Sequence, residues 1–363
     1  MTTKTILFFL IYLQFTCTAH TQESPKAREA NDLLAALITD SGVTGAAAGY
    51  AVEGKTAWKN AAGYRCAEDQ LPFTDSTRTR TASIAKTMTA VAIMQLVEQG
   101  RIDLDLPVQT YLPDYPKKKA GDITVRQLLA HTSGIGQYQS EKEAENQTDF
   151  PSLEAAMAVF KDRDLLFEPG TAYYYTTYGY VVLGRIIEVV SGQSYEAYLQ
   201  KNIWDVAGMT RTGVEKLPSN PANRSCLYQK HKRKTKAARA NNLSNRVPGG
   251  GLFTTLDDMI RFGNAIVENR LIKAATLEQM TQSQFAQKAG NPYGLGWFLY
   301  GPPPHESVVI GHSGEQTGAA TQIMLIPKSK TVVVVLANTS GTWKDVVTLA
   351  SALIGISEKP GQD

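Results

Sequence analysis

The chain has 363 residues, of which 43% are hydrophobic and 20% are charged, and its formal net charge is +3. This composition is typical of a soluble globular protein of one or two domains. So small a net charge gives no reason to expect a nucleic acid or an anionic membrane as the partner. The one basic cluster, 230–236 ("KHKRKTK"), has no interleaved aromatic residue, and we interpret it as a solvated loop.

The first 19 residues have the features of a signal peptide. Lys4 precedes an apolar run at 6–15, and residues 17–19 (Cys-Thr-Ala) offer small side chains to signal peptidase. The run is shorter than the roughly 20 residues that span a membrane, and no later stretch reaches that length without interruption. We therefore expect a periplasmic or secreted protein with a linker at 20–29. Lipid attachment at Cys17 is the less favoured alternative.

Strand patterns lie at the two ends of the remaining chain. An amphipathic helix at 30–40 is followed by two strands that meet in a hairpin at Glu53-Gly54. The uninterrupted apolar run 332–335 is typical of a strand covered on both faces, and a turn at 327–330 precedes it. The predicted strands are 45–54, 56–65, 292–301, 307–314 and the two parts of 321–338 on either side of the turn at 327–330. A closing helix begins near Trp343.

The middle of the chain, 83–289, is predicted to be helix and loop. Helical spacing with a Gly or turn signal near the end marks 123–134, 178–192 and 254–268. These patterns together predict an α/β (α+β) fold. It consists of one antiparallel sheet built from both chain ends (30–82 and 290–358) with flanking helices and a mostly helical insertion, within one domain over 30–358.

The stretch 81–100 ("TASIAKTMTAVAIMQLVEQG") predicts a helix with Lys86 on an apolar face. A buried ammonium is costly, and desolvation lowers the pKa of a lysine toward values at which the neutral amine acts as a base. Ser83 lies one turn earlier, where helix N–H groups favour developing negative charge. A nucleophilic serine needs such a base. The alternative is that Ser83 only caps the helix while Lys86 reaches to solvent.

Further segments complete a known series. The motifs S-I-A-K (83–86), "FEPGTAYYYTTYGYVVLG", "GGGLFTTLDDMIRF", "YGLGW" and "GHSGEQTG" occur in that order. This order resembles the serine β-lactamase and penicillin-binding protein superfamily, and most of all the class C β-lactamases, DD-carboxypeptidases and related esterases. The resemblance covers about Ala30 to Ile356 and implies a β-lactamase/transpeptidase-like fold.

The resemblance also implies roles for individual residues. Ser83 would be the acylated nucleophile and Lys86 its base partner. Tyr175 matches the family tyrosine that passes a proton to or from the leaving group. The backbone N–H groups of Ser83 and Glu315 would form the oxyanion hole. His312, Ser313 and Gly314 occupy the K-T-G motif.

Two positions depart from the family pattern. Thr177 stands where the family usually has Asn, so a carboxamide is shortened to a hydroxyl. His312 replaces a lysine, so a permanent cation becomes a group expected to titrate near neutrality. Both changes favour the DD-peptidase and esterase-like branches over efficient class C β-lactamases.

Several other candidates are discounted. Ser313 lies in "GHSGE", which differs from the nucleophile elbow G-x-S-x-G at Glu315. His131 ends a predicted helix, and we interpret it as structural, interacting with the terminal carbonyls. The glycines at 249–251 indicate tight backbone near the site. The tyrosines around Tyr175 are interpreted mainly as packing residues.

Cys66 and Cys226 would remain after signal cleavage. They either pair in an oxidising compartment or stay as separate buried thiols. The sequence has no C-x-x-C and no histidine pair at ligand spacing, so we expect neither a metal site nor an organic cofactor.

Together these features predict an exported serine hydrolase that forms an acyl-enzyme. The expected substrates are small peptides, amides or esters, including cell-wall D-alanyl peptides, with β-lactams as slow acylating ligands. A serine esterase of the same fold is one alternative. A catalytically weak binding or self-assembling scaffold is the other, because a fold does not fix a function. We expect activity to rise from acid to neutral or mildly alkaline pH.

Overall fold

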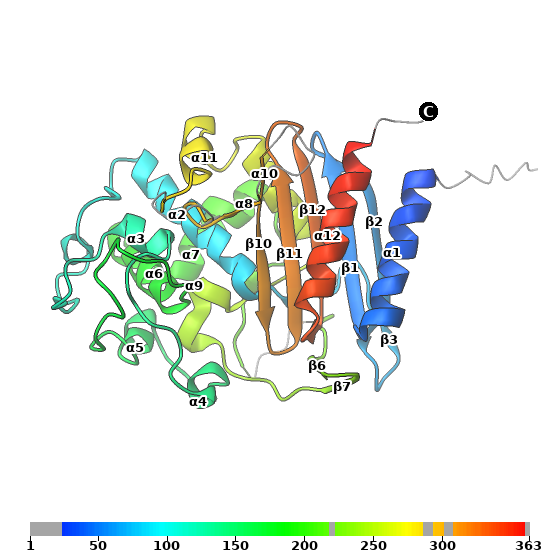
Figure 1. Cartoon of the computed structure of the whole chain (residues 1–363), viewed down its shortest axis with the longest axis horizontal. Coiled ribbons are helices and arrows are strands. Elements are labelled where there is room, and N and C mark those ends of the chain that lie inside the picture. The colour runs from blue at the N-terminus through cyan, green and yellow to red at the C-terminus, as the bar shows by residue number, and fades with distance from the viewer. Residues whose placement is uncertain (1–23, 218–221, 286–292, 301–307, 360–363) are drawn as a thin grey trace, which may run out of the picture.

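A computed structural model gives the fold of residues 24–217, 222–285, 293–300 and 308–359; the expected signal peptide and Cys17 lie outside the described residues. Two regions lie side by side (Figure 1): a sheet carrying helices α1 and α12 on one face, and a mostly helical region. Within the described residues, no helix is both long and apolar enough to cross a membrane.

The large sheet combines both ends of the chain, as the sequence predicts. β1 pairs antiparallel with β12 from Ala46↔Ala337 to Val52↔Thr331, which joins the N-terminal hairpin to the C-terminal strands. Glu53 (φ 50°) and Gly54 (φ 78°) form the predicted turn, with the two positive φ angles of a type I′ hairpin. In sheet order the strands are β3 (Leu71–Pro72), β2 (Lys55–Cys66), β1 (Gly45–Val52), β12 (Thr331–Ala337), β11 (Ala319–Ile326), β10 (Val309–Gln316) and β9 (Phe298–Tyr300).

β12 is buried on both faces, which confirms the interpretation of its apolar run. Val333 and Val335 pack in the cluster formed with α1 (Pro25–Ser41) and α12 (Trp343–Glu358). Val332 and Val334 face the opposite way, into the larger core that contains α10 (Leu256–Val267). Each fully buried valine contributes about 1.5–3 kcal/mol of transfer free energy, so this strand anchors both layers.

The first helix begins earlier than expected. α1 starts at Pro25, because the Ser24 side chain accepts a hydrogen bond from the Ala27 N–H and proline suits the first helical position. Residues 25–29 are therefore helical, and the prediction of a linker up to residue 29 is wrong.

Helices dominate the inserted region, as expected. Beside α10, its helices are α2 (Ala85–Glu98), α3 (Val125–Leu129), α4 (Glu141–Ala144), α5 (Leu153–Met157), α6 (Tyr178–Ser191), α7 (Tyr195–Leu199), α8 (Asp205–Ala207), α9 (Val247–Gly250) and α11 (Ala274–Met280). Short helical turns are η1 (Ala82–Ile84), η2 (Val108–Thr110), η3 (Gln200–Trp204) and η4 (Ser244–Arg246).

Two small sheets in and around this region were not expected. One has the order β4-β8-β5 and the other β13-β6-β7. Their strands are β4 (Thr79–Arg80), β5 (Gly213–Val214), β8 (Leu252–Thr254), β6 (Tyr228–His231), β7 (Lys234–Ala237) and β13 (Thr339–Ser340).

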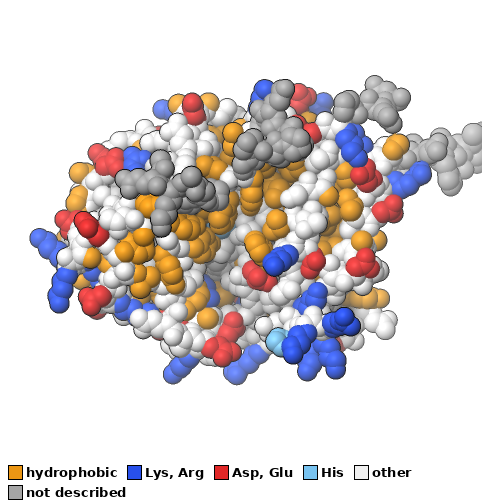
Figure 2. Space-filling view, in the orientation of Figure 1, with side chains coloured by type: hydrophobic (Ala, Val, Ile, Leu, Met, Phe, Trp, Pro, Cys, Tyr) orange, Lys and Arg blue, Asp and Glu red, His pale blue; other side chains and the backbone are white. Residues whose placement is uncertain are grey.

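The basic cluster lies on the second small sheet and is a β-hairpin rather than a loop. β6 and β7 pair from Tyr228↔Ala237 to His231↔Lys234, and Lys232 at the turn has a φ of 56°. Its lysines and arginine gather on one corner of the surface (Figure 2), so the prediction of a solvated segment holds. The cluster has no apolar alternation, which is why its sequence does not reveal the strands.

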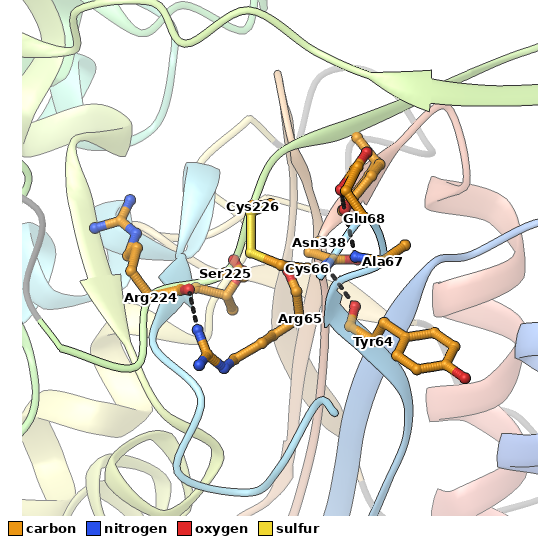
Figure 3. Close-up of a disulfide and its surroundings, with 11 residues drawn as sticks. Tyr64, Arg65, Cys66, Ala67, Glu68, Arg224, Ser225, Cys226 and Asn338 are labelled. Atoms are coloured by element: carbon orange, nitrogen blue, oxygen red, sulfur yellow. Dashed lines mark hydrogen bonds between the residues drawn. A yellow bond between two sulfur atoms is a disulfide. The ribbon is translucent and has the colours of Figure 1, made fainter. Parts of the chain in front are cut away.

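A disulfide ties the sheet to the inserted region. Cys66 ends β2 and bonds to Cys226, with a Cα–Cα distance of 5.0 Å across 160 residues of sequence (Figure 3). The pairing alternative is thus the one that the structure adopts. For a loop of this length the chain-entropy model gives about 5 kcal/mol of stabilisation.

Candidate active site

The backbone places Ser83 at a strained junction between sheet and helix. β4 leads into η1, where Ala82 has a φ of 48°, a left-handed conformation that costs a non-glycine residue about 1–2 kcal/mol. β10 packs against this turn, and a Cβ on Gly314 would lie 2.9 Å from the Ala82 Cβ. The helix predicted from residue 81 therefore begins as a 3₁₀ turn, and Ser83 at its centre remains partly exposed.

Lys86 is completely buried (0% exposed) on the first turn of α2. Its Nζ lies 3.1 Å from Ser83 Oγ, 3.3 Å from Thr177 Oγ1 and 2.8 Å from the Gly249 carbonyl, so its polar partners are all uncharged. Burial, with a smaller effect from the charge of Arg246, holds the pKa of the Lys86 amine well below its ordinary value. The serine and lysine are thus brought together, and the solvent-exposed alternative for Lys86 is wrong.

Tyr175 lies beside the same amine. The centre of its ring is 4.9 Å from Lys86 Nζ. Burial raises the pKa of the Tyr175 phenol well above 10, although a hydrogen bond with Ser83 partly opposes the shift. At neutral pH the phenol therefore holds its proton. Of the two groups next to Ser83, Lys86 is the one able to accept a proton and Tyr175 the one able to donate.

His312 does not behave as the sequence predicted. It is buried, its Nε2 lies 3.0 Å from the Tyr293 hydroxyl, and its Nδ1 lies 2.6 Å from the Ser313 carbonyl. Since a carbonyl only accepts, Nδ1 carries the proton and Nε2 accepts from Tyr293. Burial, and next the nearby charge of Lys86, lower the pKa of His312 to about 3. The expected titration near neutrality is wrong, because both nitrogens are engaged away from water.

Glu315, whose N–H the sequence assigned to an oxyanion hole, lies next to the last residue of β10. The strand turns into β11 through two residues, with Gln316 opposite Ala319. In a hairpin with a two-residue turn, the pair that closes the turn is hydrogen-bonded and the next pair is not. Glu315 and Ala320 form that next pair, so the N–H of Glu315 points away from β11. The Glu315 carboxylate accepts from the Gly341 N–H, and only its backbone remains for the site. Ser313 lies inside this strand rather than at a strand-to-helix elbow, which supports discounting it as the nucleophile.

His131 has different partners from those expected. It has a φ of 59° and no exposed surface, and its Nδ1 accepts a hydrogen bond from the Thr176 N–H at 3.2 Å. Its ring lies 4.3 Å from that of Tyr175. The imidazole therefore packs beneath the tyrosine segment, and it is the backbone N–H of His131 that bonds a helix carbonyl, that of Leu128 at 3.4 Å.

Sequence reasoning missed the contacts of Thr177. Gln137 Oε1 accepts a hydrogen bond from the Thr177 N–H at 2.9 Å, and Gln137 Nε2 donates to Thr177 Oγ1 at 3.2 Å. Tyr138 and Arg246 lie next to this pair, with the guanidinium carbon of Arg246 4.4 Å from the centre of the Tyr138 ring. No spacing rule links residues 40 or 108 positions apart, so nothing in the sequence pattern marks these contacts.

Comparison with known proteins agrees with the geometry. The family model described as Beta-lactamase matches residues 30–354. The chain is 27% identical to the mouse serine beta-lactamase-like protein LACTB, mitochondrial, over 85% of this chain and 75% of that protein.

Two solved structures share the fold. The octameric penicillin-binding protein homologue from Pyrococcus abyssi has a TM-score of 0.78 at 27% identity, covering 90% of this chain and 77% of that chain. A D-stereospecific amidohydrolase from Streptomyces sp. has a TM-score of 0.76 at 26% identity, covering 90% and 98%. The predicted fold class is confirmed.

Proposed function

The chain belongs to the beta-lactamase family, and we propose that within it this protein is an exported serine hydrolase that acylates Ser83 with small D-amino-acid amides or peptides. The observation that carries the proposal is the pair formed by Ser83 and Lys86. A buried amine of low pKa, 3.1 Å from a partly exposed hydroxyl, is the arrangement that activates a serine.

The residues support a complete acylation step. Lys86 takes the Ser83 proton as Oγ bonds to the substrate carbonyl carbon, and the carbonyl electron pair moves onto oxygen. The N–H groups of Ser83 and Glu315 stabilise that oxyanion, a contribution of about 3–4 kcal/mol for a single donor in other enzymes.

When the C–N bond breaks, the leaving amine takes a proton from Tyr175, and the Lys86 ammonium returns one to the phenol. Water then repeats the sequence on the acyl-enzyme.

Two features support amides that lack a carboxylate over β-lactams. His312 is neutral, so it supplies no positive charge for the carboxylate of a β-lactam or of a peptide C-terminus. Thr177 offers a hydroxyl in place of a carboxamide. The likeness to the D-stereospecific amidohydrolase is consistent with this choice.

Export is supported by the N-terminal sequence and by the disulfide. The apolar run 6–15 with small residues at 17–19 has the form of a signal peptide. The Cys66–Cys226 bond is typical of proteins from oxidising compartments.

The test is intact-protein mass spectrometry after incubation with a fluorescent penicillin and, separately, a fluorophosphonate. Wild type, Ser83→Ala and the control Ser351→Ala, on the exposed face of α12, are compared. We expect fluorophosphonate labelling in wild type and the control but not in Ser83→Ala. We also expect slow penicillin labelling of wild type and faster hydrolysis of D-alaninamide than of L-alaninamide.

Other outcomes point to other functions. Hydrolysis of p-nitrophenyl esters without either amide would support the esterase alternative. No adduct with either probe would support the non-catalytic scaffold. Labelling that survives in Ser83→Ala would remove Ser83 from its role.

A further inference from the structure

The hydroxyl of Thr177 poses a chemical problem beside Lys86. A neutral amine has two N–H donors and one lone pair. The Gly249 carbonyl, 2.8 Å away, accepts one N–H. If Thr177 accepts the other, the lone pair is left for the proton of Ser83. If Thr177 instead donated to the amine, the lone pair would be occupied and Lys86 would be unable to act as a base.

Gln137 decides between the two orientations. Its Oε1 accepts the backbone N–H of Thr177 at 2.9 Å, so the other end of the amide must be the NH₂ group. That group donates to Thr177 Oγ1 at 3.2 Å, and Lys86 Nζ lies 3.3 Å from the same oxygen. Two donors fill both lone pairs of the hydroxyl oxygen.

The hydroxyl proton has a separate acceptor. With Lys86 and Gln137 as donors to Thr177 Oγ1, the hydroxyl proton is left for the Tyr138 oxygen, which interacts with both Thr177 and Arg246. The Arg246 guanidinium also stacks over the Tyr138 ring and donates to the Glu143 carbonyl at 3.1 Å, which fixes the position of the tyrosine. The Thr177 proton is thus directed away from Lys86.

We propose that Gln137 is a positioning residue which holds the Thr177 hydroxyl as a hydrogen-bond acceptor for Lys86, so that the lone pair of the amine faces Ser83. This inference rests on the proposed function, in which Lys86 is the base. The hydrogen bonds that the described residues give the Gln137 side chain both go to Thr177, not to Ser83.

The test compares one substitution in two backgrounds. Gln137→Met keeps the length of the side chain and removes both hydrogen bonds to Thr177. Thr177→Val keeps the shape of the side chain and removes the hydroxyl, so no hydroxyl proton can be directed at Lys86. The readout is the second-order rate constant for labelling by a fluorophosphonate, which does not depend on the natural substrate.

We expect Gln137→Met to slow labelling about tenfold in the wild-type background, a fraction of what a general base contributes. In the Thr177→Val background the same change should slow labelling less than about twofold, because no hydroxyl remains for Gln137 to orient. Equal slowing in the two backgrounds would overturn the inference. Gln139→Met, an exposed glutamine on the same loop, is the matched control and should leave the rate unchanged.

The pH profile separates this role from simple loosening of the loop. The groups that face Lys86 are Ser83, Thr177, the Gly249 carbonyl, the Tyr175 and Tyr180 rings, and the more distant His131, His312 and Arg246. A hydroxyl that donates to the amine favours its neutral form. Gln137→Met should therefore lower the plateau rate without moving the acid limb to higher pH. Water entering a loosened site would favour the ammonium and move that limb upward, which would contradict the inference.

The proposed function is tested separately by labelling of Ser83→Ala. If that variant is still labelled, the proposed function fails. If labelling requires Ser83 but Gln137→Met acts equally in both backgrounds, only the inference about Gln137 fails.

Discussion

Two buried basic side chains lie on either side of Ser83 in the sequence, three residues before it and three after it. Arg80 and Lys86 both have 0% exposure. Arg80 donates from Nε to both oxygens of Glu215, at 3.0 and 3.1 Å, and from Nη1 to Asn241. Lys86 has only the uncharged partners described above. Arg80 keeps its charge, because burial lowers its pKa only to about 10 and the charge of Glu145 opposes that shift, whereas burial holds the pKa of Lys86 well below its usual value.

Two differences separate these buried groups: a guanidinium has a higher ordinary pKa than an amine, and only Arg80 has a carboxylate partner. Beside a carboxylate the charge is retained, and the group anchors structure: Arg80 joins β4 to Glu215 and, through the Thr317 carbonyl, to the β10–β11 turn. Lys86 has only uncharged partners and a pKa held well below its ordinary value, which is the condition that a base requires. The predictions below change Lys86 or its partners, and then the carboxylate partner of Arg80.

Removing the base should have the largest effect. Lys86→Met should lower the rate of fluorophosphonate labelling by about 10³-fold, because nothing then takes the Ser83 proton. The folded state should keep its stability in urea, since the neutral amine is replaced by an apolar side chain of similar length. A labelling rate within tenfold of wild type would show that another group is the base.

Giving Lys86 a carboxylate should make it resemble Arg80. Thr177→Asp places an acid about 3 Å from Nζ, which should raise the pKa of Lys86 and hold it as an ammonium. We expect labelling at pH 7 to fall about 100-fold and to recover only at alkaline pH. Thr177→Asn is the control, because it has the same shape without the charge. Equal rates at pH 7 for the two variants would contradict the role assigned to the neutral amine.

Taking the carboxylate from Arg80 should cost stability. Glu215→Gln leaves the Arg80 and Arg224 guanidinium groups buried without their acid, and breaking such a network typically costs about 3–5 kcal/mol. Urea unfolding measures this change. Glu196→Gln, in the exposed pair with Lys216, should cost less than about 1 kcal/mol. A similar small loss for Glu215→Gln would mean that Arg80 is not held by this charge.

A smaller effect should appear in the pH dependence of folding. His312 has a pKa of about 3 in the folded state, below its ordinary value of 6.5. Between those values the unfolded chain binds the extra proton, so stability falls as pH falls, by about 1.4 kcal/mol per pH unit for one such group. His131 acts in the same direction. In His312→Gln the slope of the free energy of unfolding between pH 4 and 6 should be shallower; an unchanged slope would show that His312 does not stay neutral.

Local patterns account for most of what the sequence predicted. The apolar run 332–335, the Glu53-Gly54 turn and the three-residue spacing of Ser83 and Lys86 each carry their signal within one element. That is why the sheet frame, the hairpin and the serine–lysine contact were predicted correctly.

The missed features depend on contacts between distant segments. β4, β5 and β8 are each two or three residues long, which is too short to show an alternation of apolar and polar side chains. The pKa of His312 depends on burial beneath Tyr293, and its residue type alone suggests titration near neutrality. The Gln137–Thr177 clamp joins two loops whose approach only the tertiary fold determines.

The central claim is that Lys86 is a neutral amine at neutral pH, and NMR of its side chain tests it most directly. Protein labelled with ¹⁵Nζ,¹³Cε-lysine would be titrated from pH 5 to 11, and the Lys86 signal assigned by its loss in Lys86→Met. We predict one lysine with neutral-amine shifts at pH 7 while the others titrate near their ordinary pKa. A Lys86 signal that stays in the ammonium form up to pH 10 would contradict the account.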